Sequence, residues 1–288
     1  MSSLPLPAGR RLHPNFFALG AIALWASLAS LGVSLGQVPP FLLTGLALLI
    51  GSVPAWPHWR QWRVSRSALA LGVYGLFGYH FLLFIALRHA PAVEANLVNY
   101  LWPLLIVVLA PMWLPQVRLR PVHWLAALLG FGGAALAILS GRQLSSGLAW
   151  GYLPAAGAAF IWASYSLATR RLSERGEPFP TAAIGLFGVV SGVLSLACHA
   201  LLEPAASLSV RDLGLVALMG LGPLGAAFFL WDRALKAGDP RTIGVLSYIT
   251  PLASTALLTT LTGRSLTPGL ALAALLIVGA ALLAVRAR

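Results

Sequence analysis

Two short polar motifs, 148 residues apart, each end in a proline inside an apolar stretch. The first reads Asn99-Tyr100-Leu101-Trp102-Pro103 and the second reads Ser247-Tyr248-Ile249-Thr250-Pro251. Proline has no N–H, and its ring clashes with the carbonyl four residues earlier, so that carbonyl loses its helical partner. The carbonyls concerned belong to Asn99 and Ser247. Such backbone survives at membrane depth only where it faces protein or a watery cavity, and there it can accept a hydrogen bond from an ammonium group.

A tyrosine–histidine pair, Tyr79 and His80, falls near the centre of another apolar stretch. Ionisable residues in such places usually face the protein interior and mark a pathway or a relay. His80 is therefore a candidate for substrate contact or for proton transfer, and Tyr79 accompanies it. The competing interpretation is a neutral packing histidine that makes a single hydrogen bond.

Three tryptophans, Trp25, Trp102 and Trp162, lie inside apolar stretches rather than at their ends. Each offers a flat apolar face and an N–H that needs an acceptor, so these residues could flank a cavity or simply fill space. Tyr165 extends Trp162 into a polar aromatic face, and we expect that face to line a cavity.

The elements that position these residues follow from the composition. Of the 288 residues, 59% are hydrophobic and only 9% are charged, whereas a soluble domain carries about 25% charged residues. The composition therefore excludes an ordinary soluble enzyme. A membrane helix needs about 20 apolar residues, and because the chain contains ten such stretches, a single membrane anchor is excluded as well. The ten predicted spans cover 15–35, 41–56, 67–87, 92–114, 122–139, 148–168, 180–202, 213–235, 242–261 and 269–285.

The basic residues predict which side of the membrane each connection faces. With ten spans, 15 of the 19 Lys and Arg residues fall on the side of the N-terminus and 4 on the other. Basic residues stay in the cytoplasm, so both termini are predicted to be cytoplasmic in a multi-pass protein of a bacterial-type inner membrane. The net charge of +12 is thus a topology signal and not a nucleic-acid surface, since the basic residues form no aromatic-interleaved patch.

Three sequence matches indicate an internal repeat. Leu24-Trp25-Ala26-Ser27 recurs as Ile161-Trp162-Ala163-Ser164, the segment 86–103 matches 234–251 without a gap, and 121–132 resembles 268–279. Five spans in each copy make the second copy enter the membrane from the opposite face, which places Arg88 outside and its counterpart Lys236 inside. Inverted repeats put a substrate site near the membrane midplane and support alternating access.

The predicted fold is therefore an all-α membrane protein with ten transmembrane helices in two inverted five-helix repeats. Its predicted parts are a cytoplasmic tail at 1–14, a first repeat at 15–139, a linker at 140–147, a second repeat at 148–285 and a cytoplasmic tail at 286–288. Because interrupted helices at matching positions mark the binding site of such carriers, we expect Asn99, Tyr100, Ser247 and Tyr248 to line the central cavity. Pro103 and Pro251 would then be hinges; two ordinary packing kinks are the alternative.

These features resemble the drug/metabolite transporter superfamily, in its ten-helix EamA branch. The resemblance covers the whole chain and rests on the repeat and on the paired prolines. Within that branch, the stretch from Asn99 to Pro103 and the pair Tyr79-His80 look most like the YddG-type exporters of aromatic and other neutral amino acids. The resemblance implies an exporter of a neutral, preferably aromatic, amino acid. An exporter of drugs or another neutral metabolite, and a non-transporting assembly or lipid-handling protein, are the alternatives.

The positions of the charged residues narrow the substrate class. No Lys or Arg falls in the middle of a predicted span, which disfavours phosphorylated and nucleotide-sugar substrates, and no carboxylate is expected at mid-membrane either. We interpret Asp232 and Lys236 as an ordinary i, i+4 pair at the end of a span, and Glu203 as a solvated loop residue. A neutral or zwitterionic substrate fits this pattern best.

Motifs for enzymatic chemistry are missing, since the chain has no HExxH site, nucleophile elbow, phosphate loop or Cys/His cluster. We therefore expect no enzyme, no cofactor and no metal. The expected partners are a small zwitterionic substrate and membrane lipid, not nucleic acid, and the expected state is a monomer. Proton coupling through His80 and downhill uniport both stay open.

Overall fold

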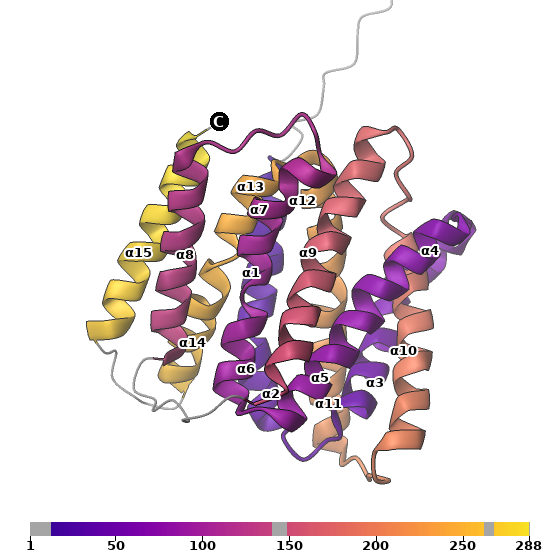
Figure 1. Cartoon of the computed structure of the whole chain (residues 1–288). Coiled ribbons are helices and arrows are strands. Elements are labelled where there is room, and N and C mark those ends of the chain that lie inside the picture. Colours follow the sequence, from indigo (N-terminus) through magenta and orange to yellow (C-terminus); the bar gives the residue numbers. More distant parts are fainter. Residues whose placement is uncertain (1–12, 140–148, 262–267, 288) are drawn as a thin grey trace, which may run out of the picture.

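The computed structural model describes residues 13–139, 149–261 and 268–287, and every regular element in those ranges is a helix (Figure 1). The predicted linker 140–147 and nearly all of the predicted tail 1–14 lie outside the described residues. In the first half the elements are α1 (Pro14–Ala26), α2 (Leu28–Ser34), α3 (Pro40–Ser52), η1 (Val53–Trp62), α4 (Arg66–Val73), η2 (Tyr74–Gly78), α5 (Tyr79–His89), α6 (Ala92–Asn99), α7 (Trp102–Trp113) and α8 (Pro121–Leu139). In the second half they are α9 (Tyr152–Glu174), α10 (Ala183–Leu202), α11 (Val210–Leu221), η3 (Gly222–Ala226), α12 (Ala227–Ala237), α13 (Pro240–Leu246), α14 (Ile249–Leu261) and α15 (Pro268–Arg286).

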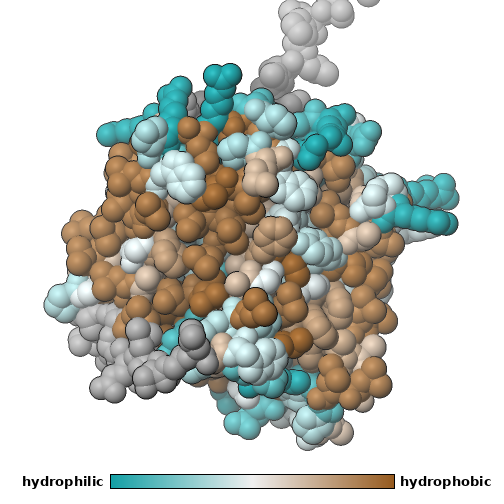
Figure 2. All heavy atoms as spheres, in the orientation of Figure 1, coloured by the Kyte–Doolittle hydropathy of each residue, from teal (hydrophilic) through white to brown (hydrophobic). Residues whose placement is uncertain are grey.

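Eight helical runs are long and apolar enough to cross a membrane, and each coincides with a predicted span. They are Pro14–Ser34, Pro40–Trp62, Arg66–His89, Ala92–Trp113, Pro121–Leu139, Ala183–Leu202, Val210–Ala237 and Pro268–Arg286. Figure 2 shows the corresponding surface, on which an apolar band separates two hydrophilic ends. Leu153 and Leu275 are 79% and 72% exposed, which suits a surface covered by lipid tails rather than by water.

The other two predicted spans correspond to α9 and to α13 with α14. α9 lies in the middle of the bundle in Figure 1 and packs against α5, α6, α7, α12 and η2. Protein covers much of this helix, so it can carry Ser164, Tyr165 and Ser166, all buried, where a lipid-facing helix could not. α13 and α14 are separated by the proline-associated break and are individually short.

Both proline motifs interrupt their helices, as the sequence predicts. α6 ends at Asn99 and α7 begins at Trp102, while α13 ends at Leu246 and α14 begins at Ile249. The prediction that the Ser247 carbonyl is free is wrong, however, because this carbonyl oxygen accepts a hydrogen bond from the Thr250 N–H at 3.0 Å. A tight i to i+3 turn supplies a donor in place of the missing one.

The two broken helices meet near their breaks. α13 packs against α7, and a Cβ added at Gly244 would come within 3.0 Å of the Pro103 carbonyl oxygen. Glycine thus permits a backbone approach at this crossing that a larger residue would hinder.

The two halves are interlocked. α1 packs against α12 and η3 of the second half, whereas α9 packs against α5 and η2 of the first half. The elements η2 and η3 are both π-helical turns, and they begin 148 residues apart, at Tyr74 and Gly222. π turns are rare and are frequent at functional sites, so their matched positions direct attention to the space between these helices.

Candidate functional site

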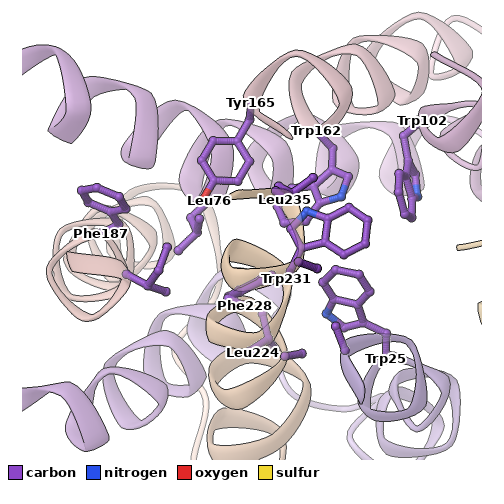
Figure 3. Close-up of a cluster of buried hydrophobic side chains, with 14 of the residues drawn as sticks. Trp25, Leu76, Trp102, Trp162, Tyr165, Phe187, Leu224, Phe228, Trp231 and Leu235 are labelled. Atoms are coloured by element: carbon purple, nitrogen blue, oxygen red, sulfur yellow. The ribbon is translucent and has the colours of Figure 1, made fainter. Parts of the chain in front are cut away.

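An aromatic cluster occupies the space between the two halves (Figure 3). We define it by its five buried members: Trp25 of α1, Trp102 of α7, Trp162 of α9, and Phe228 and Trp231 of α12. The ring centroid of Trp25 lies 5.1 Å from that of Trp231 and 5.7 Å from that of Trp162. Trp102 lies 5.7 Å from Trp231. These separations are typical of favourable ring contacts, so each half of the chain supplies rings to one continuous aromatic surface.

The indole N–H groups of this cluster have defined partners. Trp25 Nε1 donates to the Pro223 carbonyl oxygen at 3.0 Å, and Pro223 lies in the π turn η3. Trp231 Nε1 donates to Ser166 Oγ at 3.2 Å. Because a buried indole N–H needs an acceptor, these two bonds fix the orientation of both rings.

The predicted polar residues of the first half adjoin the cluster. The Tyr79 ring lies 5.4 Å from Trp162, and the His80 ring lies 6.3 Å from Phe228. Asn99 Nδ2 donates to Tyr79 Oη at 3.0 Å. Asn99 is buried, and within the described part of the chain its Oδ1 has no hydrogen-bond partner. A buried acceptor without a partner is costly, which makes this oxygen available to a donor on a ligand.

Two further predicted residues pack into the same region. The Tyr165 ring lies 5.4 Å from Trp162, and a Cβ added at Gly75 of η2 would come within 2.4 Å of the Tyr165 ring. The His80 Nδ1 donates to the Leu76 carbonyl oxygen at 2.6 Å, since a carbonyl can only accept. This single bond matches the packing interpretation of His80 at that nitrogen.

The second-half candidates lie elsewhere. The Tyr248 ring packs 6.4 Å from Phe131 of α8 and belongs to a separate apolar group. Ser247 Oγ donates back to the Ile243 carbonyl oxygen at 2.8 Å. The structure therefore does not bring Ser247 and Tyr248 to the aromatic cluster. Tyr100 is half-buried and caps the end of α6.

Sequence reasoning misses two members of the cluster, Phe228 and Trp231. Both lie inside the predicted span 213–235. The criterion that singles out Trp25, a tryptophan inside a span rather than at its end, therefore also selects Trp231. No such signal marks Phe228, because phenylalanine is common throughout apolar spans.

The interpretation of Glu203 as a solvated loop residue is wrong. Its side chain is 0% exposed and accepts from Arg88 at 2.7 Å and from His199 at 3.0 Å. It also accepts from the backbone N–H groups of Phe41 at 3.1 Å and Leu42 at 3.3 Å. The carboxylate thus caps the N-terminus of α3, where a negative charge is favoured, and ties α3 to α5 and α10.

The predicted pair of Asp232 and Lys236 is present at 2.7 Å, but it is more than an exposed helix pair. Asp232 is 1% exposed and also accepts from Thr181 Oγ1 at 2.7 Å. Lys236 Nζ donates to the Phe179 carbonyl oxygen at 2.6 Å. The pair therefore joins α12 to the connection between α9 and α10.

Two pockets open at the end of the bundle where α12 finishes. One, of about 330 Å³, is lined by Arg63, Val64, Ser65, Ser67, Ala68, Leu172, Glu177, Pro178, Phe179 and Pro180. The other, of about 460 Å³, is lined by Trp113, Pro115, Gln116, Arg171, Glu174 and Arg175. Neither is lined by a member of the aromatic cluster, whose rings pack on one another.

Comparison with known proteins identifies relatives of the whole chain. The EamA-like transporter family model matches residues 13–139 and 149–286. The chain is 41% identical to the aromatic amino acid exporter YddG of Ancylobacter novellus over 95% of this chain and 97% of that protein. It is 30% identical to the aromatic amino acid exporter YddG of Escherichia coli K12 over 95% of this chain and 97% of that protein.

A solved crystal structure has the same fold, with a TM-score of 0.89 and 40% sequence identity over 95% of this chain and 96% of that one. These matches cover both halves of the molecule and name transporters rather than enzymes. The chain belongs to the EamA-like transporter family of the drug/metabolite transporter superfamily.

Proposed function

We propose that this transporter exports neutral, preferentially aromatic, amino acids across the bacterial inner membrane by alternating access. The observation that carries the proposal is the aromatic cluster, to which α1 and α7 of the first half and α9 and α12 of the second all contribute. The ring of an aromatic substrate could take the place of one indole in a ring–ring contact of the cluster. The exchange would cost little free energy, because aromatic pairs are favourable in both offset-stacked and edge-to-face arrangements.

The polar part of the substrate would bind beside this cluster. Asn99 Oδ1 can accept from an α-ammonium group, and the Tyr79 hydroxyl bonded to Asn99 holds the amide in place. Tyr100, one residue on at the end of α6, completes the proposed lining. Pro103 and Pro251 would act as hinges, and Ser247 and Tyr248 would support the second hinge against α8.

The proposed architecture is ten spans in two inverted five-helix repeats, 15–139 and 148–285. Two observations support it: the π turns stand at equivalent positions of the sequence match, and the first helix of each half packs against the third span of the other. In this arrangement both termini are cytoplasmic and the working unit is a monomer surrounded by lipid.

The deciding experiment is counterflow of labelled Phe, Trp and Thr in liposomes that contain the pure protein. We expect saturable exchange of Phe and Trp that is weakened by Trp102→Ala. The matched control is Trp124→Ala, which removes a 43% exposed indole from α8. No exchange above empty liposomes would overturn amino acid transport, and competition by drugs or other neutral metabolites alone would favour the alternative substrates.

A further inference from the structure

A buried ion pair lies at the edge of the aromatic cluster, on the side of the proposed cytoplasm. Asp232 follows Trp231 directly in α12, and Lys236 lies one turn further toward the end of that helix. Asp232 Oδ2 accepts from Lys236 and Thr181, both at 2.7 Å, but its buried Oδ1 has no partner among the described residues. The pair therefore retains an unused acceptor.

A stabilising role does not require charged side chains at these two positions. A buried ion pair often contributes no more than well-packed apolar residues of the same volume, because both charges lose their hydration. The charge contact itself lies within α12, and it is the hydrogen bonds to Thr181 and to the Phe179 carbonyl that tie this helix to the connection between α9 and α10. The position of the pair next to Trp231 suggests a use in recognition.

One residue, Phe179, contacts the pair and also lines a pocket at the protein surface. Phe179 lines the 330 Å³ pocket, its carbonyl oxygen accepts from Lys236, and its ring lies 4.1 Å from Lys236 Nζ. Phe179 thus separates the pocket from the pair. Lys236, whose side chain is 14% exposed, is the outermost of three successive groups. Buried Asp232 lies behind it and buried Trp231 follows, so the order from the pocket inward is charge, charge, ring.

That order matches an aromatic amino acid. We propose that Asp232 and Lys236 form a subsite for the zwitterionic head group, in which Asp232 accepts from the α-ammonium and Lys236 donates to the α-carboxylate. Without substrate, Asp232 and Lys236 form an ion pair with each other. Binding replaces this one pair by two, between Asp232 and the ammonium group and between Lys236 and the carboxylate. The inference deepens the proposed function and rests on it: Asp232 and Lys236 hold the amino acid when it enters from the cytoplasmic side, before its ammonium group reaches Asn99.

The test uses two analogues that each lack one charge of phenylalanine. 3-Phenylpropanoate has no ammonium and phenethylamine has no carboxylate. Uptake of labelled Phe into inside-out membrane vesicles exposes the proposed cytoplasmic face, and each analogue is added there as a competitor. The measured quantities are the ratios of half-inhibitory concentrations, analogue over unlabelled Phe, for wild type and each variant.

Asp232→Asn is expected to lower the 3-phenylpropanoate ratio about tenfold, the usual scale for one charge-assisted hydrogen bond, and to leave the phenethylamine ratio unchanged. Lys236→Met is expected to do the reverse. Arg170→Gln is the matched control: Arg170 Nη1 donates to the Lys236 carbonyl oxygen at 2.7 Å, so this variant loosens the same helix end without touching the pair, and both ratios should hold.

A pair that acts only as a structural tie would change the Phe uptake rate in the variants and leave both ratios unchanged, which would overturn the subsite. If single charges left unpaired prevent folding, the doubly neutral variant Asp232→Asn/Lys236→Met is measured by ligand-induced thermal shift, and it must lose discrimination against both analogues. Wild-type Phe uptake with unchanged variant ratios refutes the subsite alone, whereas absent wild-type uptake refutes the proposed function and the subsite with it.

Discussion

At the scale of single residues, the proposed recognition surface is the aromatic cluster, and its members differ in how firmly they are held. Trp231 illustrates the difference, because its ring touches Trp25, Trp102 and Trp162 while its N–H is anchored to Ser166 Oγ. If a substrate ring takes the place of one of these neighbours, the anchored Trp231 ring can form an offset or edge-to-face pair with it, a contact that a branched aliphatic side chain cannot make.

Replacement of Trp231 should therefore change selectivity more than it changes rate. We expect Trp231→Leu to lower the preference for Phe over Leu about three- to tenfold, the equivalent of one ring contact. The measurement is the ratio of half-saturating Phe and Leu concentrations in counterflow. Trp59→Leu, at a 58% exposed position of η1, is the control. Equal selectivity in the two variants would remove Trp231 from the recognition surface.

Gly75 makes a second residue-scale prediction, because its missing side chain is where the Tyr165 ring lies. Gly75→Ala should overpack this contact and destabilise the protein by about 1–3 kcal/mol, with a lower midpoint in a thermal unfolding scan. Gly132→Ala is the matched control, since nothing beyond its chain neighbours and its own helix backbone comes within 4 Å of the added Cβ. Helix propensity alone should raise the stability of this variant slightly. A Gly75→Ala midpoint at or above that of Gly132→Ala would contradict the contact.

At the scale of elements, sequence reasoning succeeds where apolar length and proline decide the outcome. The helix breaks at 99–102 and 246–249 follow from Pro103 and Pro251, which act through local sterics. The burial of Glu203 does not follow from the sequence, because its partners Arg88, Phe41 and Leu42 come from two other helices. The π turns η2 and η3 are not predicted from the sequence either. Their glycines are compatible with close helix packing and equally with a wider turn, so the residue type does not decide between the two.

For the candidate site too, some residues are placed correctly by sequence reasoning and others are not. The mid-span positions of Trp25, Trp102 and Trp162 indicate interior aromatic residues, and the structure brings all three together. The equivalent motif of the second half is different: Tyr248 fits against Gly130 of α8, and a sequence repeat alone does not show which neighbour a ring will meet.

Glu203 allows an element-scale test of how α3, α5 and α10 are held together. Glu203→Gln keeps the shape but removes the charge that Arg88 and the α3 N-terminus bind, and we expect a loss of about 1–3 kcal/mol, because charge-assisted bonds and the helix dipole both weaken. Thermal unfolding at low and high salt measures this loss. Glu177→Gln, an exposed acid, should have little effect. Equal midpoints for the two variants would refute the buried role of Glu203.

At the scale of the whole molecule, side-chain contacts tie both ends of the bundle across different elements. At one end Arg88 of α5 binds Glu203 after α10. At the other, Gln116, after α7, binds Glu174 of α9. A carrier that works by alternating access must open these two ends in turn, so neither set of contacts can persist through a full cycle.

Covalent locks at the two ends test this requirement. In a Cys198→Ala background, the pairs Arg88→Cys/Glu203→Cys and Gln116→Cys/Glu174→Cys are each joined with a short bifunctional thiol reagent. We expect either lock alone to abolish Phe counterflow, because a carrier closed at one end cannot complete its cycle. Each of the four single-cysteine variants should give the same exchange before and after treatment with the reagent. A reducible linker should restore exchange when it is cleaved. Full exchange with both ends locked would mean that substrate crosses without opening either end, and alternating access would be excluded for this molecule.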